Sequence, residues 1–519
     1  MRSKLIKQNN IRMKNRKTMF FILVLVLFID TYTNAQITEM RCKTISERKS
    51  YPPKQPFFTS FSSTKSTDKD KAFILDLKYG LFSHYVWAGG SGAADLNGVA
   101  SKNIQEQINT FDVQQYARDC KSFGAQYVIF TAWHARMNPL YYSPVYRRWR
   151  DNAEVNNPDK NDRDLIAELA VALKAEGIDL FLYTHPNDLH DFTPTDKAKF
   201  DYKQMGDTTF NYSKWNDYLS EMYTEIAKRY KGKIKGFWID EGLETVSNDR
   251  FVDYKRLKAT IGTVDPSLVL IQNYWHFAPG KGKYLCDTGM KEFQIHSKWF
   301  NGFWQYGLAA DRNDANTWPS FGYSSLGYIE ENIISKENPN VLLKARDIFR
   351  YTIYQSASNY EGLGACWCVN PMRGLNTGNI WSIGIQKILS EVGDLIKPIS
   401  VSIFATEPST SWPANVDVNP DKPFEKTGDL GTVTYVAMQS KKGSYEFIHV
   451  LNPSKSEVNG KTLTLSAPVD GKVFTGAKLV KDNTVLNFRK ATNGVITIEL
   501  PDDVDWDVND TAIELIVAK

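Results

Sequence analysis

Four apolar segments of this chain, spaced roughly fifty residues apart, each end at an ionisable side chain. The four segments are 79–84, 126–134, 178–185 and 234–240, which end at His84, His134, His185 and Asp240. Continuous runs of apolar, β-branched and aromatic residues are typical of parallel strands that helices cover on both faces. Because parallel β/α folds gather their chemistry at the carboxyl ends of the strands, we expect the three imidazoles and the carboxylate to share one site.

Helical patterns fill the intervals between these strands. Residues 164–177 carry apolar side chains at helical spacing and end at Gly177, which suits a helix C-cap. A second helix is predicted over 218–230. A chain of 519 residues has room for more than one core, and the β/α alternation predicts a catalytic domain over 36–400.

The pattern changes after residue 400. Short strand-like runs follow a proline-rich stretch that predicts a linker, and no helical pattern separates them. The prolines are Pro408, Pro413, Pro420 and Pro423, and the runs are 431–437, 445–451, 495–500 and 512–517. Strands separated only by turns indicate a C-terminal antiparallel β-sandwich domain, predicted over 401–519. His449 lies inside one of these runs, and we expect it to be structural.

The first 35 residues resemble a secretory signal. Residues 2–17 carry seven basic side chains, the apolar stretch 20–29 is too short to span a bilayer, and small residues precede Gln36. We therefore expect cleavage after Ala35 and a secreted or periplasmic protein without a membrane partner. The rest of the chain carries 56 basic and 58 acidic residues, a net charge of about −2, which gives no reason to expect a nucleic-acid partner.

The cysteines do not indicate a metal site. Five cysteines allow at most two disulfides, and their connectivity stays open. Cys366 and Cys368 lie in one apolar strand-like run, where a bond between them would strain the backbone, so buried free thiols are expected. Carboxylates and imidazoles also cluster over 185–191, but their spacing fits no zinc pattern, and we expect neither a metal nor another cofactor.

Several motifs occur in the order found in one enzyme family. Residues 78–84, KYGLFSH, resemble the first-strand motif K-F-G-I-F-x-H-W-G of the α-L-fucosidases of glycoside hydrolase family 29. Residues 131–135, TAWHA, resemble its T-A-K-H-H segment, and 237–242, FWIDEG, resemble its L-W-F-D-G segment. The runs 163–164 and 176–177, and the C-terminal strands, continue the match over most of the chain.

The resemblance implies a (β/α)8-like TIM barrel, regular or irregular, that carries a retaining exo-glycosidase site. In such a site Asp240 is the nucleophile, and His84 and His134 hydrogen-bond sugar hydroxyls. Tyr183 and Trp238 would form part of the pocket wall. The remaining substrate-binding residues that we predict are His185, Trp299 and Trp304.

The acid/base of a retaining glycosidase must be a second group about 5 to 5.5 Å from the nucleophile. We predict Glu292, which lies 52 residues beyond Asp240 and is followed by an aromatic segment similar to that after the acid in some branches of the family. The alternatives are Glu331, Glu241 and His296, the last because a related fucan-cleaving family uses histidine as the acid.

The chain also departs from the family pattern. Tyr85 and Val86 replace a Trp-Gly pair, Ala135 replaces the second of two histidines, and only Tyr183 remains of a tyrosine pair. The sugar could therefore differ from plain terminal fucose or carry a sulfate or a branch, and Arg136 would suit an anion.

These observations predict an α-L-fucosidase that releases terminal α-L-fucose, or a closely related sugar, from glycans by double displacement. Two other functions stay open. One is a catalytically silent carbohydrate-binding protein, and the other is an endo-acting fucan hydrolase.

Overall fold

A computed structural model describes residues 76–414 and 433–518, all within one compact unit, Phe57–Lys519. The gaps within 76–414 are 89–90, 94, 96–98, 134–137, 152, 154–156, 187–191, 202–212, 241–251, 274–287, 291–344, 359–364, 370, 374–379 and 382. The predicted signal segment lies outside the described residues. Within the part that is described, no helix is long and apolar enough to cross a bilayer.

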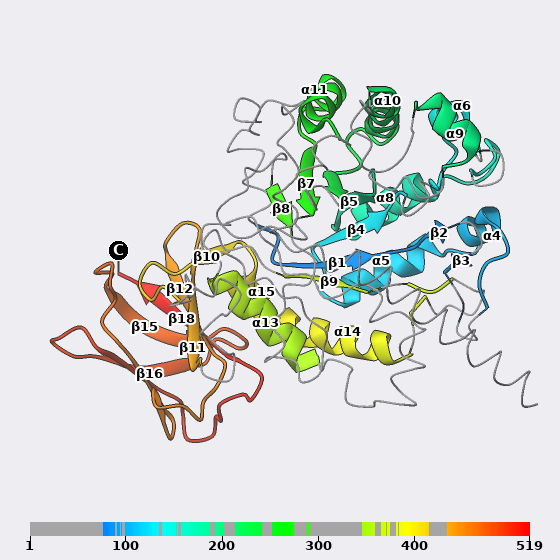
Figure 1. Ribbon diagram of the computed structural model, residues 1–519. Coiled ribbons are helices and arrows are strands. Elements are labelled where there is room, and N and C mark those ends of the chain that lie inside the picture. The colour runs from blue at the N-terminus through cyan, green and yellow to red at the C-terminus, as the bar shows by residue number, and fades with distance from the viewer. Residues whose placement is uncertain are drawn as a thin grey trace, which may run out of the picture. The chain divides into compact units, whose positions relative to one another are not determined.

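Seven parallel strands form the first sheet, in the order β8-β7-β6-β5-β4-β1-β9 (Figure 1). The strands are β1 (Tyr79–Ser83), β4 (Tyr127–Thr131), β5 (Asp179–Thr184), β6 (Gly236–Ile239), β7 (Val269–Asn273), β8 (Thr288–Met290) and β9 (Ala365–Cys368). The order follows the sequence except that the last strand lies beside the first. A doubly wound sheet would instead reverse its order at a switch point, so this sheet is a parallel half-barrel.

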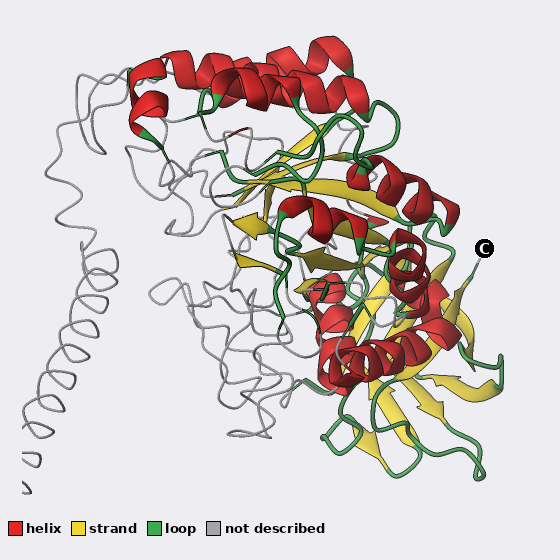
Figure 2. Cartoon of the chain, turned by 90° about the vertical axis from the view of Figure 1, so that its right-hand side faces the viewer, coloured by secondary structure: helices red, strands yellow, loops and turns green. Residues whose placement is uncertain are grey.

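Helices flank these strands (Figure 2). They are α4 (Ile104–Asn109), α5 (Val113–Ser122), α6 (Pro144–Trp149), α8 (Leu165–Ala175), α9 (Pro194–Lys199), α10 (Ser213–Arg229), α11 (Tyr254–Val264), α13 (Ala345–Ser358), α14 (Ile383–Ile396) and α15 (Ser400–Ile403), with the 3-10 turn η5 (Lys397–Ile399) before α15. A short hairpin, β2 (Trp87–Ala88) and β3 (Ser91–Gly92), follows β1.

The two predicted helices are present. Asp164 caps α8 by accepting a hydrogen bond from the backbone N–H of Ala167, and Gly177 follows the helix with φ of 72°. The helix predicted over 218–230 begins five residues earlier, at Ser213. Trp215 explains the difference, because its fully buried side chain packs on Phe192 and so stabilises the additional first turn of α10.

One face of the parallel sheet carries its own hydrophobic cluster. Its members are Leu77, Phe82, Tyr127, Ile129, Phe181, Tyr183, Trp238, Val269, Ile271 and Cys366. Most of them alternate with residues that face the covering helices, as the two-residue period of a strand requires. Gly80 shares this face, and a Cβ atom there would lie 2.1 Å from Cζ of Tyr127, so the strand has a glycine where the neighbouring tyrosine ring lies.

Nine antiparallel strands form the second sheet, in the order β10-β11-β12-β18-β15-β16-β17-β14-β13. They are β10 (Thr406–Pro408), β11 (Tyr435–Ser440), β12 (Tyr445–Val450), β13 (Val458–Asn459), β14 (Thr462–Leu465), β15 (Phe474–Leu479), β16 (Val485–Lys490), β17 (Ile496–Glu499) and β18 (Thr511–Val517). One hydrophobic cluster draws on strands from both ends of this order, such as Ala437 and Leu463, so the sheet is curled around its core.

The first part of the stretch after residue 400 is not the linker that its prolines predict, and Pro420 and Pro423 lie outside the described residues. Helix α15 continues to Ile403, and Pro408 ends the edge strand β10. An edge strand tolerates proline because a missing N–H there breaks no ladder bond.

His449 is structural, as the sequence indicates. It is fully buried in β12, with Nδ1 2.6 Å from Oδ2 of Asp510 and Nε2 3.2 Å from the carbonyl oxygen of Ser402. Close by, the buried Arg350 of α13 donates to the carbonyl oxygen of Leu451 and to Oδ1 of Asn452, both at 2.6 Å. These contacts tie the helices after β8 to the antiparallel sheet.

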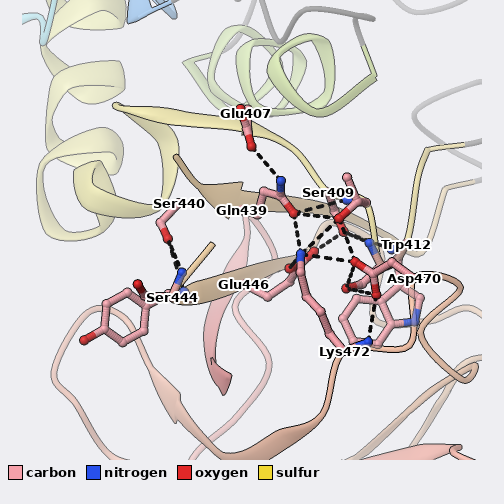
Figure 3. A network of polar contacts seen from close by, with 12 residues as sticks. Glu407, Ser409, Trp412, Gln439, Ser440, Ser444, Glu446, Asp470 and Lys472 are labelled. Atoms are coloured by element: carbon pink, nitrogen blue, oxygen red, sulfur yellow. Dashed lines mark hydrogen bonds and ion pairs between the residues drawn. The ribbon is translucent and has the colours of Figure 1, made fainter. Parts of the chain in front are cut away.

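A polar network lies along β10–β12 (Figure 3). The ammonium of Lys472 donates to Oε1 of Gln439 at 2.5 Å and lies 3.2 Å from both Oε2 of Glu446 and Oδ2 of Asp470. Ser409 donates to the other oxygen of Glu446. Glu446 is fully buried, and burial raises the pKa of its carboxyl group, so these partners offset the cost of a buried acid.

Cys120 and Cys366 are buried free thiols among the described residues, which for Cys366 agrees with the prediction. Burial raises the pKa of the Cys366 thiol to about 12, so it stays protonated and unreactive near neutral pH.

Candidate active site

Parallel pairing brings the residues that end the strands to one edge of the sheet. Asp240 directly follows β6, and its backbone N–H donates to the carbonyl oxygen of Thr184 at 2.9 Å. This bond continues the β5–β6 ladder, in which Tyr183 pairs with Trp238 and Thr184 with Ile239. His185 and Asp240 are therefore register neighbours, and their side chains leave the sheet on the same face as Tyr183.

The side chains of Tyr183 and His185 approach the carboxylate of Asp240. The Tyr183 hydroxyl donates a hydrogen bond to Oδ2 of Asp240, and Nε2 of His185 lies 3.8 Å from the same oxygen. Asp240 and His185 each keep only 7% of their surface exposed, while Tyr183 is fully buried. The carboxylate is thus held at the strand end by groups that the sheet itself positions.

A layer of rings lies beneath this carboxylate. Tyr183 stacks on Trp238 with ring centroids 5.3 Å apart and 21° between the planes. Phe82 meets Trp238 edge-on at 4.9 Å, and meets Tyr183 at 5.5 Å. Trp238 is 2% exposed, so in this structure it forms the floor under Asp240.

His84 lies on the other side of Tyr183. Their ring centroids are 4.6 Å apart and their planes are at 86°. Nδ1 of His84 lies 3.4 Å from the Thr131 hydroxyl, which itself donates to the carbonyl oxygen of Ser83 at 3.1 Å. Because the single hydroxyl proton goes to Ser83, Thr131 accepts from Nδ1–H of His84, and in the neutral ring Nε2 is then an acceptor.

Thr131, which contacts His84, was not among the site residues predicted from the sequence. Thr131 ends β4, and its side chain projects from the same face of the sheet as Tyr127 and Ile129. This two-residue alternation is the sequence pattern that could have identified Thr131 as a site residue. Tyr85, one of the departures from the family pattern, is fully buried instead. Its hydroxyl donates to the carbonyl oxygen of Gln107 at 2.7 Å, so it anchors the segment after His84 to α4.

The structure brings together five of the nine predicted site residues: His84, Tyr183, His185, Trp238 and Asp240. The others, and the alternatives for the acid/base, lie outside the described residues. They are His134, Glu241, Glu292, His296, Trp299, Trp304 and Glu331. Arg136 and the segment 187–191 also lie outside. Across the residues that are described, no group of three or more histidine, cysteine, aspartate or glutamate side chains could hold a metal ion.

An open groove of about 620 Å³ lies along α6, α10 and α11. None of the five residues above lines it. Its charged side chains include Glu221 and Glu225, which already pair with Arg148 and Arg229. The strand edge, where the carboxylate and the imidazoles meet, is therefore the better candidate for chemistry.

Comparisons with known proteins show what the chain is similar to. The model of the family described as alpha-L-fucosidase matches residues 100–315. A GH29 α-L-fucosidase structure from Bacteroides thetaiotaomicron is 16% identical, with a TM-score of 0.60, covering 90% of this chain and 98% of its own. α-L-Fucosidase isoenzyme 1 from Paenibacillus thiaminolyticus is 17% identical, with a TM-score of 0.57 and coverage of 87% and 99%. A search among curated proteins gave no match.

The family match and the similar fold together identify a glycoside hydrolase. More narrowly, residues 100–315 match the α-L-fucosidase family model, and the fold is similar to that of solved α-L-fucosidases of glycoside hydrolase family 29, as for a divergent relative.

Proposed function

We propose that the protein is an exported, retaining exo-α-L-fucosidase that releases terminal α-L-fucose or a closely related sugar. The observation that carries this proposal is the placement of Asp240 at the end of β6, held by Tyr183 and next to the imidazole of His185, with His84 packed against Tyr183. A likeness supports it as well, since one α-L-fucosidase of the same fold, from Bacteroides thetaiotaomicron, was captured as a trapped covalent intermediate with 2-fluoro-fucosyl fluoride.

In the first step Asp240 attacks the anomeric carbon. The glycosidic carbon–oxygen bond breaks, and the departing oxygen takes a proton from the acid residue, for which Glu292 is our candidate. In the second step water bonds to the anomeric carbon and gives a proton to the same residue, and the sugar leaves Asp240 with its original configuration.

Recognition of the sugar would use both polar and aromatic groups. Nε2 of His84, as an acceptor, suits a sugar hydroxyl that donates, and His134 would read a second hydroxyl. Trp299 and Trp304 would offer faces for stacking against the ring. Arg136 would favour a substrate that carries an anionic substituent such as sulfate.

We also infer the complete fold of the protein and its location outside the cytoplasm. The half-barrel would close into a (β/α)8-like barrel through residues between β8 and β9, because β9 already lies beside β1. The curled antiparallel sheet would form the predicted β-sandwich. Removal of 1–35 would leave the enzyme secreted or periplasmic.

The test is hydrolysis of 4-nitrophenyl α-L-fucoside by wild type and by Asp240→Ala. We expect a loss of at least about 10³-fold in kcat for the variant, with an unchanged unfolding midpoint. Asp179→Ala is the matched control, because this aspartate lies at the opposite end of β5 and pairs with Lys235 at 3.4 Å.

The stereochemistry provides the second half of the test. Proton NMR of the first product should show the α anomer. Inverted product, or full activity in Asp240→Ala, would rule the proposal out. Binding of the fucoside with no product from wild type would instead identify a silent carbohydrate-binding protein.

A further inference from the structure

The register of β5 and β6 fixes which side chains stand next to the nucleophile. Thr184 pairs with Ile239, so the next pair in the parallel ladder is His185 with Asp240. Residues in register on adjacent strands project from the same face, side by side. The strand register therefore places His185 next to the carboxylate of Asp240, whatever sugar is bound.

Tyr183 and His185 approach the same oxygen. Tyr183, two residues earlier on the same face, donates to Oδ2, and Nε2 of His185 lies 3.8 Å from Oδ2. Neither side chain is loosely held: Tyr183 is fully buried against Trp238, and the His185 side chain is 9% exposed. Contacts in an unliganded site are often long and tighten when charge develops.

We propose that Tyr183 and His185 are positioning residues for the nucleophile, not sugar-reading residues, and that they hold Oδ2 so that Oδ1 forms the bond to the sugar. This inference rests on the proposed function and refines the sequence-based assignment of both residues to substrate binding.

The chemistry follows from where negative charge resides. When Oδ1 bonds to the anomeric carbon, Oδ2 becomes the carbonyl oxygen of an ester and loses charge. When water attacks in the second step, the bond between the anomeric carbon and Oδ1 breaks, its electron pair returns to the carboxylate, and Oδ2 regains charge. Donors placed at Oδ2 beforehand stabilise that departing carboxylate, so their main effect falls on hydrolysis of the intermediate.

The experiment separates the two steps. Wild type is labelled with 2-fluoro-fucosyl fluoride, attachment to Asp240 is located by peptide mass spectrometry, and the rate at which activity returns measures hydrolysis of the intermediate. We expect His185→Ala and Tyr183→Phe each to recover about 10- to 100-fold more slowly, as for loss of one close polar contact to a charged group. With 4-nitrophenyl α-L-fucoside both kcat and KM should fall, and a burst equal to the enzyme concentration should appear.

Two variants serve as controls. His185→Gln places an amide N–H near the former Nε2 and should recover to within about 3-fold of wild type. Thr184→Val alters the same strand end on the opposite face, where the Thr184 hydroxyl lies 2.5 Å from that of Tyr223, and should leave the recovery rate unchanged.

Three results would count against the inference. A raised KM with unchanged kcat in His185→Ala would show that the imidazole contacts the sugar. Unchanged recovery after labelling in that variant would show that the imidazole has no role toward Asp240. Wild type that is neither active nor labelled on Asp240 would overturn the proposed function, and this inference with it.

Discussion

Tyr183 and Trp238 are register partners on adjacent strands, and their rings stack 5.3 Å apart directly beneath the carboxylate of Asp240. The stack explains how a buried phenol can reach the strand end, since the flat indole fixes the tilt of the tyrosine ring. Stability and site geometry thus depend on the same aromatic pair.

Trp238→Ala should lower the free energy of unfolding by about 3 to 5 kcal/mol, as large aromatic deletions in cores do. The hydroxyl of Tyr183 would also lose its fixed direction, so activity should fall in the folded fraction. Urea titration followed by far-UV circular dichroism checks the first effect. Trp238→Phe, which keeps a ring in the stack, should cost clearly less, and equal losses in both variants would contradict this explanation.

Gly80→Ala should destabilise the protein by at least about 2 kcal/mol, because the new methyl group would lie 2.1 Å from the ring of Tyr127. Gly262→Ala is the comparison, since a Cβ there meets nothing within 4 Å on helix α11, and should stabilise by about 0.5 to 1 kcal/mol. Thermal unfolding of both variants is the measurement. A neutral Gly80→Ala would show that Tyr127 moves aside at little cost.

Thr131→Val should raise KM for the aryl fucoside by about 10-fold and leave kcat within about 3-fold of wild type. Without the hydroxyl, Nδ1–H of His84 loses its acceptor at 3.4 Å, and the ring no longer presents Nε2 as a fixed acceptor. Thr131→Ser retains the hydroxyl and should behave like wild type. Equal KM values for the two variants would show that His84 does not bind the sugar through Nε2.

Lys78 should make stability depend on pH. This lysine is fully buried, and burial lowers the pKa of its ammonium group from 10.5 to about 7, against the opposing effect of Asp76. Between those two values the unfolded chain binds more protons than the folded one, so this contribution to stability rises with pH and is lost as pH falls through about 7.

The comparison that isolates this effect is wild type against Lys78→Met. The difference in unfolding free energy should change by up to about 1.4 kcal/mol per pH unit between pH 7.5 and 9.5, as expected for one proton. The variant should be the more stable protein at neutral pH. A difference that stays constant over this interval would mean that Lys78 keeps its proton in the folded state.

The sequence predicted the strand ends well, for a physical reason. A continuous apolar run followed by a polar residue locates the carboxyl end of a buried strand, and β1, β5 and β6 end within one residue of His84, His185 and Asp240. Parallel topology then requires these ends to meet.

Contacts between strands were harder to predict. The bond from Tyr183 to Asp240 depends on the β5–β6 register, which no single segment encodes. The same limit applies to the antiparallel strands, which were predicted individually but whose order was not. The family resemblance implied that Trp238 forms part of the pocket wall. Trp238 lies two residues before Asp240 and therefore on the same face of the sheet, where it is 2% exposed. The choice of Glu292 stays a prediction.

Arg350 reaches from α13 to the carbonyl oxygen of Leu451, and His449 reaches from β12 to that of Ser402. Ending the chain at residue 400 would leave the buried guanidinium of Arg350 without the carbonyl oxygen of Leu451 and the amide oxygen of Asn452 that accept from it. The antiparallel portion is therefore no detachable accessory, and a catalytic fragment that stops at residue 400 should aggregate or be degraded rather than work alone.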